Sequence, residues 1–149
     1  MKTARVIILA TIAALTLLAA TPGLSQILPT GEVSPDPYTY PNTLKGSTST
    51  QQFRLTNTSS RSFLDLYVFS VSVPDRTNFV IANDACTGKT LKYQQYCTLD
   101  LNFIPSEVGH YATTLSFIDL SRKIIDTAAI DGIGVAPAVF LSQTSVDFG

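Results

Sequence analysis

The sequence predicts an all-β protein, a sandwich of two antiparallel sheets built from about seven short strands. Apolar and polar residues alternate over short segments, and polar turn clusters separate these segments at intervals of roughly 8–12 residues, as in sandwich folds. After residue 25, apolar residues nowhere keep a helical period over three turns. One domain is therefore expected after an N-terminal leader.

The clearest predicted strand is Tyr96–Phe103, in which apolar and polar residues alternate without a break. Such alternation is typical of an antiparallel strand with one buried face and one exposed face. The residues predicted to face the core are Cys97, Leu99, Leu101 and Phe103. The residues predicted to face solvent are Tyr96, Thr98, Asp100 and Asn102.

Five further segments are predicted to be strands: Val33–Pro41, Gln52–Thr56, Leu64–Val73, Tyr111–Asp119 and Lys123–Asp131. The first contains three prolines, which are tolerated in an edge strand but not in a central one. Within these segments the residues predicted to face inward are Phe53, Leu55, Leu115, Phe117, Ile124, Ala128 and Ile130. The polar segments 57–62 and 104–110 are predicted to be connections.

Residues 1–25 are predicted to be a secretory signal peptide. Lys2 and Arg5 precede an uncharged run from Val6 to Ala20, which is short for a membrane span of about 20 residues but fits a signal peptide. Cleavage is expected after Ser25, with a cut after Ala20 and an uncleaved anchor as alternatives. No cysteine follows the run, which argues against a lipid anchor.

Cys86 and Cys97 are the only two cysteines of the chain. Export places them in a compartment where disulfides form, so they are predicted to be joined. Closing such a short loop stabilises the fold by about 2–3 kcal/mol in the chain-entropy model. The alternatives fit less well, because two cysteines and one histidine leave a zinc site incomplete and a redox pair usually has CxxC spacing.

No residue pattern indicates an enzyme. His110 is the only histidine, and it lies in a predicted solvated turn without a GxSxG motif elsewhere in the chain. Gly132-Ile133-Gly134 is an isolated GxG with no helix after it, so it does not indicate a nucleotide-binding loop. We therefore expect no catalytic residue and no cofactor. The formal net charge of −1 also gives no electrostatic footprint for nucleic acid.

Two binding hypotheses involve surface residues. Asp75, Asn83 and Asp84 offer oxygen ligands for Ca²⁺, but their spacing differs from that of a calcium loop, so we expect no metal site. Six tyrosines could line a carbohydrate-binding platform, although scattered tyrosines in a sandwich are more often half-buried. They are Tyr38, Tyr40, Tyr67, Tyr93, Tyr96 and Tyr111.

Six motifs follow one another in an order typical of a bacterial domain family. They are GSTSTQQF (46–53), LTNTSS (55–60), NF (78–79), NDACTG (83–88), YCTLDLNFIPSEVGHYATTLSF (96–117) and DGIGVAP (131–137). Together they resemble the choice-of-anchor D domains and the wider group of ASPM, SPD-2 and Hydin (ASH) modules, over residues 33–149. The YQQY before Cys97 departs from the family's usual Pro-Gly turn, and Ser59-Ser60 replaces its usual Gly.

This resemblance implies an immunoglobulin-like antiparallel β-sandwich over residues 26–137, related to the major sperm protein and PapD-like folds. It also implies a non-enzymatic module, often found in tandem or attached to other domains. The two departures concern turn geometry and leave the fold assignment unchanged.

The segment LSQTSVDFG (141–149) is similar to VSPDPYTYP (33–41), with Ser second and an aromatic residue eighth in both. The spacing of 108 residues is about the length of one sandwich domain. Residues 138–149 are therefore predicted to be the first strand of a second, truncated repeat. Three explanations stay open: the chain is a fragment, the segment folds back on its own domain, or it pairs with an exposed edge of another molecule.

The function expected from these observations is that of an exported, non-enzymatic structural or interaction module, a spacer or adhesion domain of a cell-surface, periplasmic or secreted protein. The alternative is a carbohydrate- or Ca²⁺-binding accessory domain of a larger exported enzyme. The expected partner is another protein or a neighbouring repeat, with strand exchange through 138–149 as one route. Neither nucleic acid nor, after signal cleavage, a membrane is expected as a partner.

Overall fold

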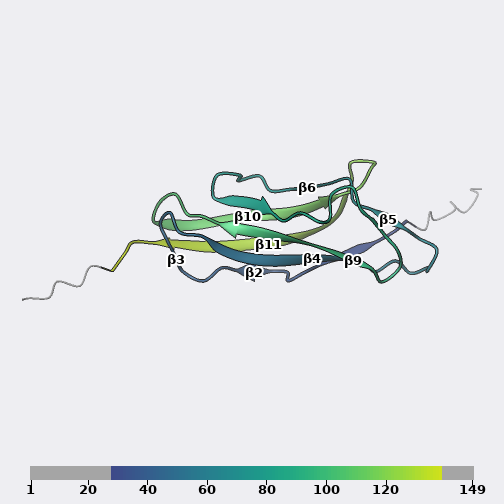
Figure 1. The fold of residues 1–149 in the computed structure, drawn as a ribbon, viewed down its shortest axis with the longest axis horizontal. Coiled ribbons are helices and arrows are strands. Elements are labelled where there is room, and N and C mark those ends of the chain that lie inside the picture. The colour runs from purple at the N-terminus through teal and green to yellow at the C-terminus, as the bar shows by residue number, and fades with distance from the viewer. Residues whose placement is uncertain (1–27, 139–149) are drawn as a thin grey trace, which may run out of the picture.

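The computed structural model describes residues 28–138, which form two packed β-sheets without a helix (Figure 1). The strands are, in chain order, β1 (Gly31–Ser34), β2 (Tyr38–Thr39), β3 (Thr43–Leu44), β4 (Ser49–Asn57), β5 (Leu66–Tyr67), β6 (Ser70–Ser72), β7 (Phe79–Ala82), β8 (Thr90–Leu91), β9 (Tyr96–Phe103), β10 (Gly109–Ile118) and β11 (Ile124–Val135). The predicted sandwich is confirmed, although shorter strands replace some of those expected. In this part of the chain no helix is long and apolar enough to cross a membrane.

The predicted signal peptide (1–25) and nearly all of the predicted second repeat (138–149) lie outside the described residues. Both therefore stay predictions from the sequence.

The first sheet has the strand order β1-β4-β9-β7, and all its pairs are antiparallel. The second sheet has the order β2-β11-β10-β6, and β3 pairs with β11 beyond the end of β2. The short strands β2 and β3 run parallel to β11, whereas β10 runs antiparallel to it. A separate two-stranded ribbon joins β5 and β8. The two sheets enclose one hydrophobic core.

The predicted edge strand Val33–Pro41 is divided between the two sheets, which corrects the prediction of one strand. β1 pairs with β4 in the first sheet, and β2 pairs with β11 in the second. The prolines between them cannot donate to a ladder, so pairing stops there. Two carboxylates replace the lost contacts: Asp36 Oδ1 accepts from Ala129 N, and Asp126 Oδ2 accepts from Val33 N, both at 2.8 Å.

The predicted strand Leu64–Val73 is also divided, into β5 and β6. The break falls at Val68 and Phe69, whose amides donate to different parts of the structure. Val68 N donates to Lys89 O next to β8, and Phe69 N donates to Ile118 O on β10, both at 2.8 Å. The segment therefore crosses from the ribbon to the second sheet, which a continuous apolar sequence does not reveal.

The prediction that Ile124 faces inward is wrong, because its side chain is 63% exposed. Phe117 pairs with Asp126, but the next residue, Ile118, pairs with Ile124, so the register shifts and Ile125 has no paired residue. A shift of one residue reverses the faces of a strand, and Ile125 packs against the core instead. The other residues predicted to face inward are buried: Phe53, Leu55, Cys97, Leu99, Leu101, Phe103, Leu115, Phe117, Ala128 and Ile130.

Tyr40 links the two sheets through the centre of the core. Its backbone N donates to Asp131 O on β11 (2.8 Å), and its hydroxyl donates to Leu101 O on β9. Its ring centroid lies 5.4 Å from that of Phe103 and 6.2 Å from that of Phe79. Burial raises the pKa of Tyr40 well above its usual value, so the hydroxyl keeps its proton. The aromatic rings and this hydrogen bond fix the spacing of the sheets.

Gly132 gives the GxG motif a packing role. A Cβ atom at this position would lie 2.6 Å from Phe103 Cε1. At Gly134, a Cβ atom would lie 2.4 Å from the carbonyl oxygen of Glu107. Both glycines therefore let β11 approach its neighbours more closely than any side chain allows.

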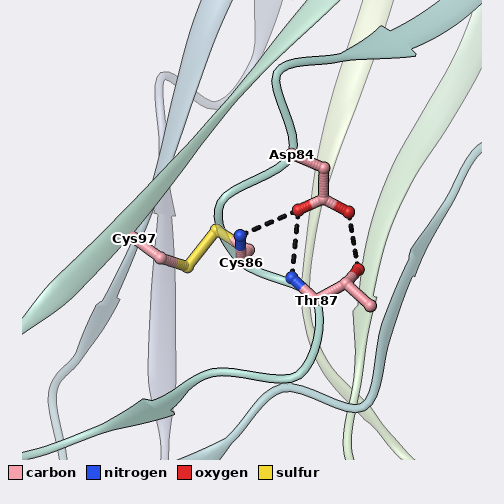
Figure 2. Close-up of a disulfide and its surroundings, with 4 residues drawn as sticks. All are labelled: Asp84, Cys86, Thr87 and Cys97. Carbon is pink, nitrogen blue, oxygen red and sulfur yellow. Dashed lines mark hydrogen bonds between the residues drawn. A yellow bond between two sulfur atoms is a disulfide. The ribbon is translucent and has the colours of Figure 1, made fainter.

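The cysteines predicted to pair do form a disulfide. The bond joins Cys86, in the connection between β7 and β8, to Cys97 on the central strand β9. Figure 2 shows how the Asp84 carboxylate orders this connection by accepting from Cys86 N (2.8 Å), Thr87 N (3.0 Å) and Thr87 Oγ1 (2.6 Å). The bond therefore fastens an irregular connection to the middle of the first sheet.

Replacing Tyr40 by Phe should lower the free energy of unfolding by about 1–2 kcal/mol, because the buried Leu101 carbonyl loses this hydrogen bond. Urea unfolding measures the change, and Tyr67→Phe, at a 38% exposed position, is the matched control. The raised pKa gives a second test. The stability that a protonated Tyr40 provides is present below about pH 10 and is lost as pH rises through the folded-state pKa, so Tyr40→Phe should lack this alkaline loss. Equal stability of the two tyrosine variants at neutral pH would contradict the bridging role.

Replacing Gly132 by Ala should destabilise the protein by about 1–3 kcal/mol, since the new methyl group overlaps the Phe103 ring. Without that overlap, replacing Gly by Ala in a strand is expected to stabilise the protein. The sign of the change in stability therefore shows whether the overlap exists. Thermal unfolding decides it, with Ile133→Ala on the neighbouring exposed position as the control. A Gly132→Ala protein that is more stable than the parent would exclude the close packing described above.

Replacing both cysteines by Ser should lower the free energy of unfolding by about 3 kcal/mol while leaving the strand content unchanged. The loss arises mainly because the unfolded chain is no longer closed between Cys86 and Cys97, which are 11 positions apart. Urea unfolding and far-ultraviolet circular dichroism measure the two effects. Two reactive thiols in the parent protein isolated from its source would show that the disulfide is absent.

Candidate functional site

His110 lies on β10 and not in a turn as predicted, but it is solvent-exposed as expected. Its Nε2 lies 3.0 Å from Asp131 Oδ1 on the neighbouring β11, and both side chains are exposed. Among residues 28–138, no serine hydroxyl is hydrogen-bonded to His110. The pair joins two adjacent strands on the outer face of the second sheet.

Asp75 closes a turn before β7. Its carboxylate accepts from the backbone N of Thr77 and of Asn78, both at 3.0 Å, and from Asn78 Nδ2 at 2.9 Å. Desolvation alone would raise the pKa of Asp75, but these hydrogen bonds outweigh it and hold the pKa below its usual value. Its oxygens are thus occupied by local donors.

Asn83 and Asp84, the other two residues weighed as calcium ligands, are likewise engaged locally. Asp84 orders the disulfide connection (Figure 2), and Asn83 Nδ2 donates to Asp100 Oδ2 at 2.8 Å. Asp100 also accepts from Gln52 Nε2 at 3.3 Å, on the exposed face of β9 where the sequence predicts it. In the part of the chain that the structure describes, no three His, Cys, Asp or Glu side chains gather as metal ligands.

The six tyrosines do not share one face. Tyr40 is buried in the core, and Tyr38 and Tyr111 pack against it. Tyr67, Tyr93 and Tyr96 are exposed, and the Arg54 guanidinium lies over the Tyr96 ring, 5.3 Å from its centroid. At least half of the proposed carbohydrate platform therefore belongs to the core.

A groove of about 350 Å³ runs along the open side of the sandwich, between the edge strands β6 and β7. This volume is near the lower end for ligand pockets. The residues along it include Val71, Val73, Arg76, Phe79, Ile81 and Asp84. It is a mostly apolar groove with one charge of each sign, and this arrangement suits binding better than proton transfer.

The chain enters and leaves the sandwich at opposite ends of its longest axis (Figure 1). We call these ends the N-terminal pole, at the start of β1, and the C-terminal pole, at the end of β11. A domain with this arrangement adds its own length to any chain that contains it. The two poles are the surfaces nearest to the neighbouring segments of the same chain.

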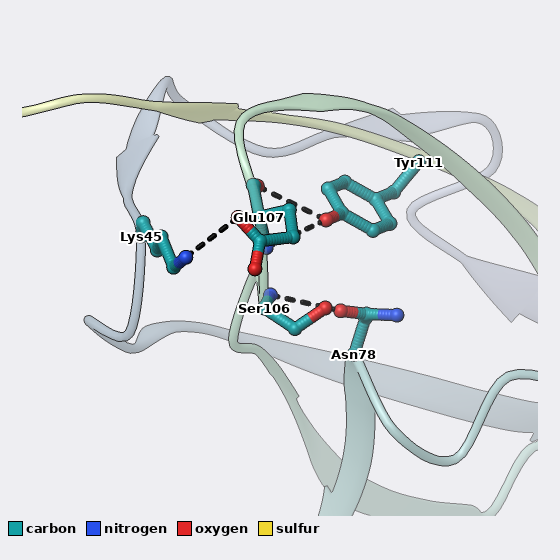
Figure 3. Close-up of polar contacts among 5 residues, drawn as sticks. All are labelled: Lys45, Asn78, Ser106, Glu107 and Tyr111. Carbon is teal, nitrogen blue, oxygen red and sulfur yellow. Dashed lines mark hydrogen bonds and ion pairs between the residues drawn. The ribbon is translucent and has the colours of Figure 1, made fainter.

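The C-terminal pole is held together by polar contacts between three connections. Figure 3 shows Lys45 Nζ 2.6 Å from Glu107 Oε2, and the Tyr111 hydroxyl bonded to the backbone N and O of Glu107 (2.9 and 3.0 Å). The Asn78 side chain accepts from Ser106 N at 3.0 Å. These contacts order the loop between β9 and β10 against the segments before β4 and β7.

Two apolar side chains are exposed at this ordered pole. Leu44, which pairs with Val135 at the end of β11, is 45% exposed, and Val108 is 59% exposed. An exposed apolar residue alone is ordinary. Here two of them flank the point where the chain leaves the domain.

The N-terminal pole is organised around Asn57, whose side chain is fully buried. It donates to Leu64 O (2.9 Å) and Leu91 O (2.8 Å) and accepts from Ser59 N (3.0 Å) and Ser59 Oγ (2.6 Å). Ser59 Oγ in turn accepts from Thr30 N at 3.0 Å. Exposed apolar residues around this pole are Leu28, Phe63, Leu120 and Ile124.

Sequence analysis missed both poles. Their residues come from segments far apart in the chain, such as Leu44 and Val108, and lie in connections without a repeating pattern. Only the topology brings them together. The disulfide, in contrast, could be predicted because only one pairing of two cysteines exists.

No protein-family model matches the sequence, and no curated protein matches it. Solved structures do show similarity. The ASH/PapD-like domain of human CEP192 (PapD-like domain 7) superposes with a TM-score of 0.55 at 15% identity, over 87% of this chain and 100% of that one.

Two bacterial structures are similar in part. The secreted serine protease VesC from Vibrio cholerae gives a TM-score of 0.53 at 18% identity, over 75% of this chain and 24% of that chain. A Porphyromonas gingivalis protein of unknown function gives 0.54 at 15% identity, over 76% of this chain and 51% of that chain. This chain thus spans about a quarter of the protease and half of the second protein.

At these identities the likeness concerns the fold. The expected immunoglobulin-like sandwich is confirmed by the two-sheet topology and by its superposition on the whole CEP192 domain. Residues 28–138 have the ASH-type, PapD-like immunoglobulin fold.

Proposed function

We propose that residues 26–137 act as a non-enzymatic interaction and spacer module of an exported protein. The observation that carries this proposal is the position of the two poles at opposite ends of the longest axis (Figure 1). A domain of this shape holds the chain segments on its two sides apart. In this proposal the module works through its surface, and carboxylates such as Asp75 and Asp84 order local turns.

Export is supported by the sequence of residues 1–25 and by the disulfide, since disulfides persist mainly outside the cytosol. The likeness to a part of VesC adds an instance in which this fold belongs to a larger secreted polypeptide. The proposed location is the cell surface, the periplasm or the medium. The proposed partner is a protein or a neighbouring domain of the same chain.

A second candidate function is that of a binding domain for carbohydrate or Ca²⁺ within a larger exported enzyme. The groove between β6 and β7 favours it, because it is the kind of concave apolar surface that takes ligands. Against it, Asp75 and Asp84 already accept several hydrogen bonds each, and Tyr40 is buried. We therefore place the interaction module first.

Fractionation of the source cells, with an antibody against residues 28–138, tests the proposal. The protein should be found in the surface, periplasmic or secreted fraction, and its N-terminal residue should be Gln26. Recovery from the cytosol with Met1 and residues 2–25 intact would refute export.

A ligand screen of the exported protein separates the two candidate functions. A glycan array and a calcium titration followed by calorimetry should both give no signal. Saturable glycan binding that Arg76→Ala abolishes, or saturable Ca²⁺ binding that Asp84→Asn abolishes, would establish the ligand-binding function instead. Arg122→Ala, on the turn between β10 and β11, is the control and should leave either binding unchanged.

A further inference from the structure

The similarity between segments 33–41 and 141–149 extends further upstream in both segments. At the same spacing of 108 residues, Ala136-Pro137-Ala138 align with Leu28-Pro29-Thr30, with the proline in common. The structure also shows which positions of the first copy face the core: Val33, Tyr38 and Tyr40. Their counterparts are all apolar: Leu141, Val146 and Phe148. The repeat therefore preserves the pattern of core-facing residues that lets one segment serve both sheets.

The chain is anchored on both sides of this repeat boundary. At the C-terminal pole, Val135 pairs with Leu44, and Val135 O accepts from Lys45 N at 2.9 Å. At the N-terminal pole, Thr30 N donates to Ser59 Oγ and Thr30 O accepts from Thr58 N, both at 3.0 Å. These two bonds use only backbone atoms of Thr30, so Ala138 offers the same groups to a following copy.

Val135 is the last anchored residue of one copy, and Ala138 takes the place of Thr30 as the first anchored residue of the next. Only Ala136 and Pro137 lie between them. Four consecutive residues, 135 to 138, span at most about 10–11 Å between their outer Cα atoms. This is close to the roughly 10 Å that separates two packed sheets in a protein core. A gap of this width is filled by side chains from both sides.

We propose that the C-terminal pole packs directly against the N-terminal pole of a following copy of this fold, with Leu44 and Val108 buried in the junction. The inference rests on the proposed function as a module within a longer exported chain. The partner surface on the second copy is the pole at which Phe63, Leu120 and Ile124 are exposed on this copy. Both sides of the junction thus carry exposed apolar side chains.

The C-terminal pole is ordered before any partner arrives. Gly46 N donates to Pro105 O at 2.9 Å, Lys45 pairs with Glu107, and Gly134 lies too close to Glu107 for any side chain. A surface that is already ordered loses little conformational freedom on contact. The junction therefore holds consecutive copies in one orientation, and the array is a stiff rod.

A two-copy chain tests this inference. In this test protein, a first copy (residues 26–138) is joined directly to a second copy (residues 31–138). Only the first copy is isotopically labelled. Residues 28–138 of each copy contain a complete hydrophobic core. Thermal unfolding of a single copy is measured first, and a cooperative transition shows that one copy folds on its own. Amides of residues 44–47 and 106–108 in the first copy should exchange at least about tenfold more slowly than in the same chain with a flexible Gly/Ser linker of about 12 residues after Ala138.

Leu44→Ser with Val108→Ser in the first copy should return exchange at both loops to the rate of the linker-containing chain. Val80→Ser, at a 40% exposed position on β7, is the control and should leave the slow exchange unchanged. Equal exchange in the direct and linker-containing chains would overturn the junction. Protection that survives the double substitution would overturn the role of Leu44 and Val108. Neither outcome affects export, which fractionation tests separately.

Discussion

The hydrogen bond from the Tyr40 hydroxyl to the Leu101 carbonyl is the contact on which the arrangement of the two sheets depends. Tyr40 is attached to β11 of one sheet through its backbone and to β9 of the other through its side chain. Around it, stacked rings such as Phe79 and Phe103, whose centroids are 5.0 Å apart, fill the space between the sheets. Because one segment, 31–40, contributes β1 to one sheet and β2 and Tyr40 to the other, the sandwich is closed along that side by covalent continuity. On the opposite side, the edge strands β6 and β7 are joined by the irregular connection 73–78, and the groove lies between them.

Where one strand has one partner on each side and a regular register, the sequence predicts it well. Tyr96–Phe103 is the best example, since β4 and β7 flank β9 and its alternation persists over its full length. Predictions failed where the chain changes partners. Leu64–Val73 has the pattern of one apolar run but bonds first to β8 and then to β10, and Ile124 is exposed because the register slips by one residue. Such events depend on the position of distant strands, and local alternation carries no signal for them.

Among the candidate functional features, too, some could be predicted from the sequence and others depend on the fold. The disulfide was predictable from the sequence, because two cysteines allow a single pairing and residues 1–25 have the pattern of a signal peptide. The packing of Gly132 against Phe103 and of Gly134 against Glu107 could not be predicted from the GxG motif, because it depends on the fold. The poles were not predictable, since their residues meet only after β3, β9, β10 and β11 are in place. A surface built from such distant segments leaves little trace in the local sequence pattern.

The most direct test of this account is a nuclear magnetic resonance measurement of the Tyr40 ring and hydroxyl in the purified protein. The account predicts a slowly exchanging hydroxyl proton, with nuclear Overhauser effects from the ring to Phe79 and Phe103 on the opposite sheet. That result would establish that residues 31–40 cross between the sheets and that the domain is closed on this side. A hydroxyl proton in rapid exchange with water, with no contact between Tyr40 and these rings, would show that the two sheets are joined differently.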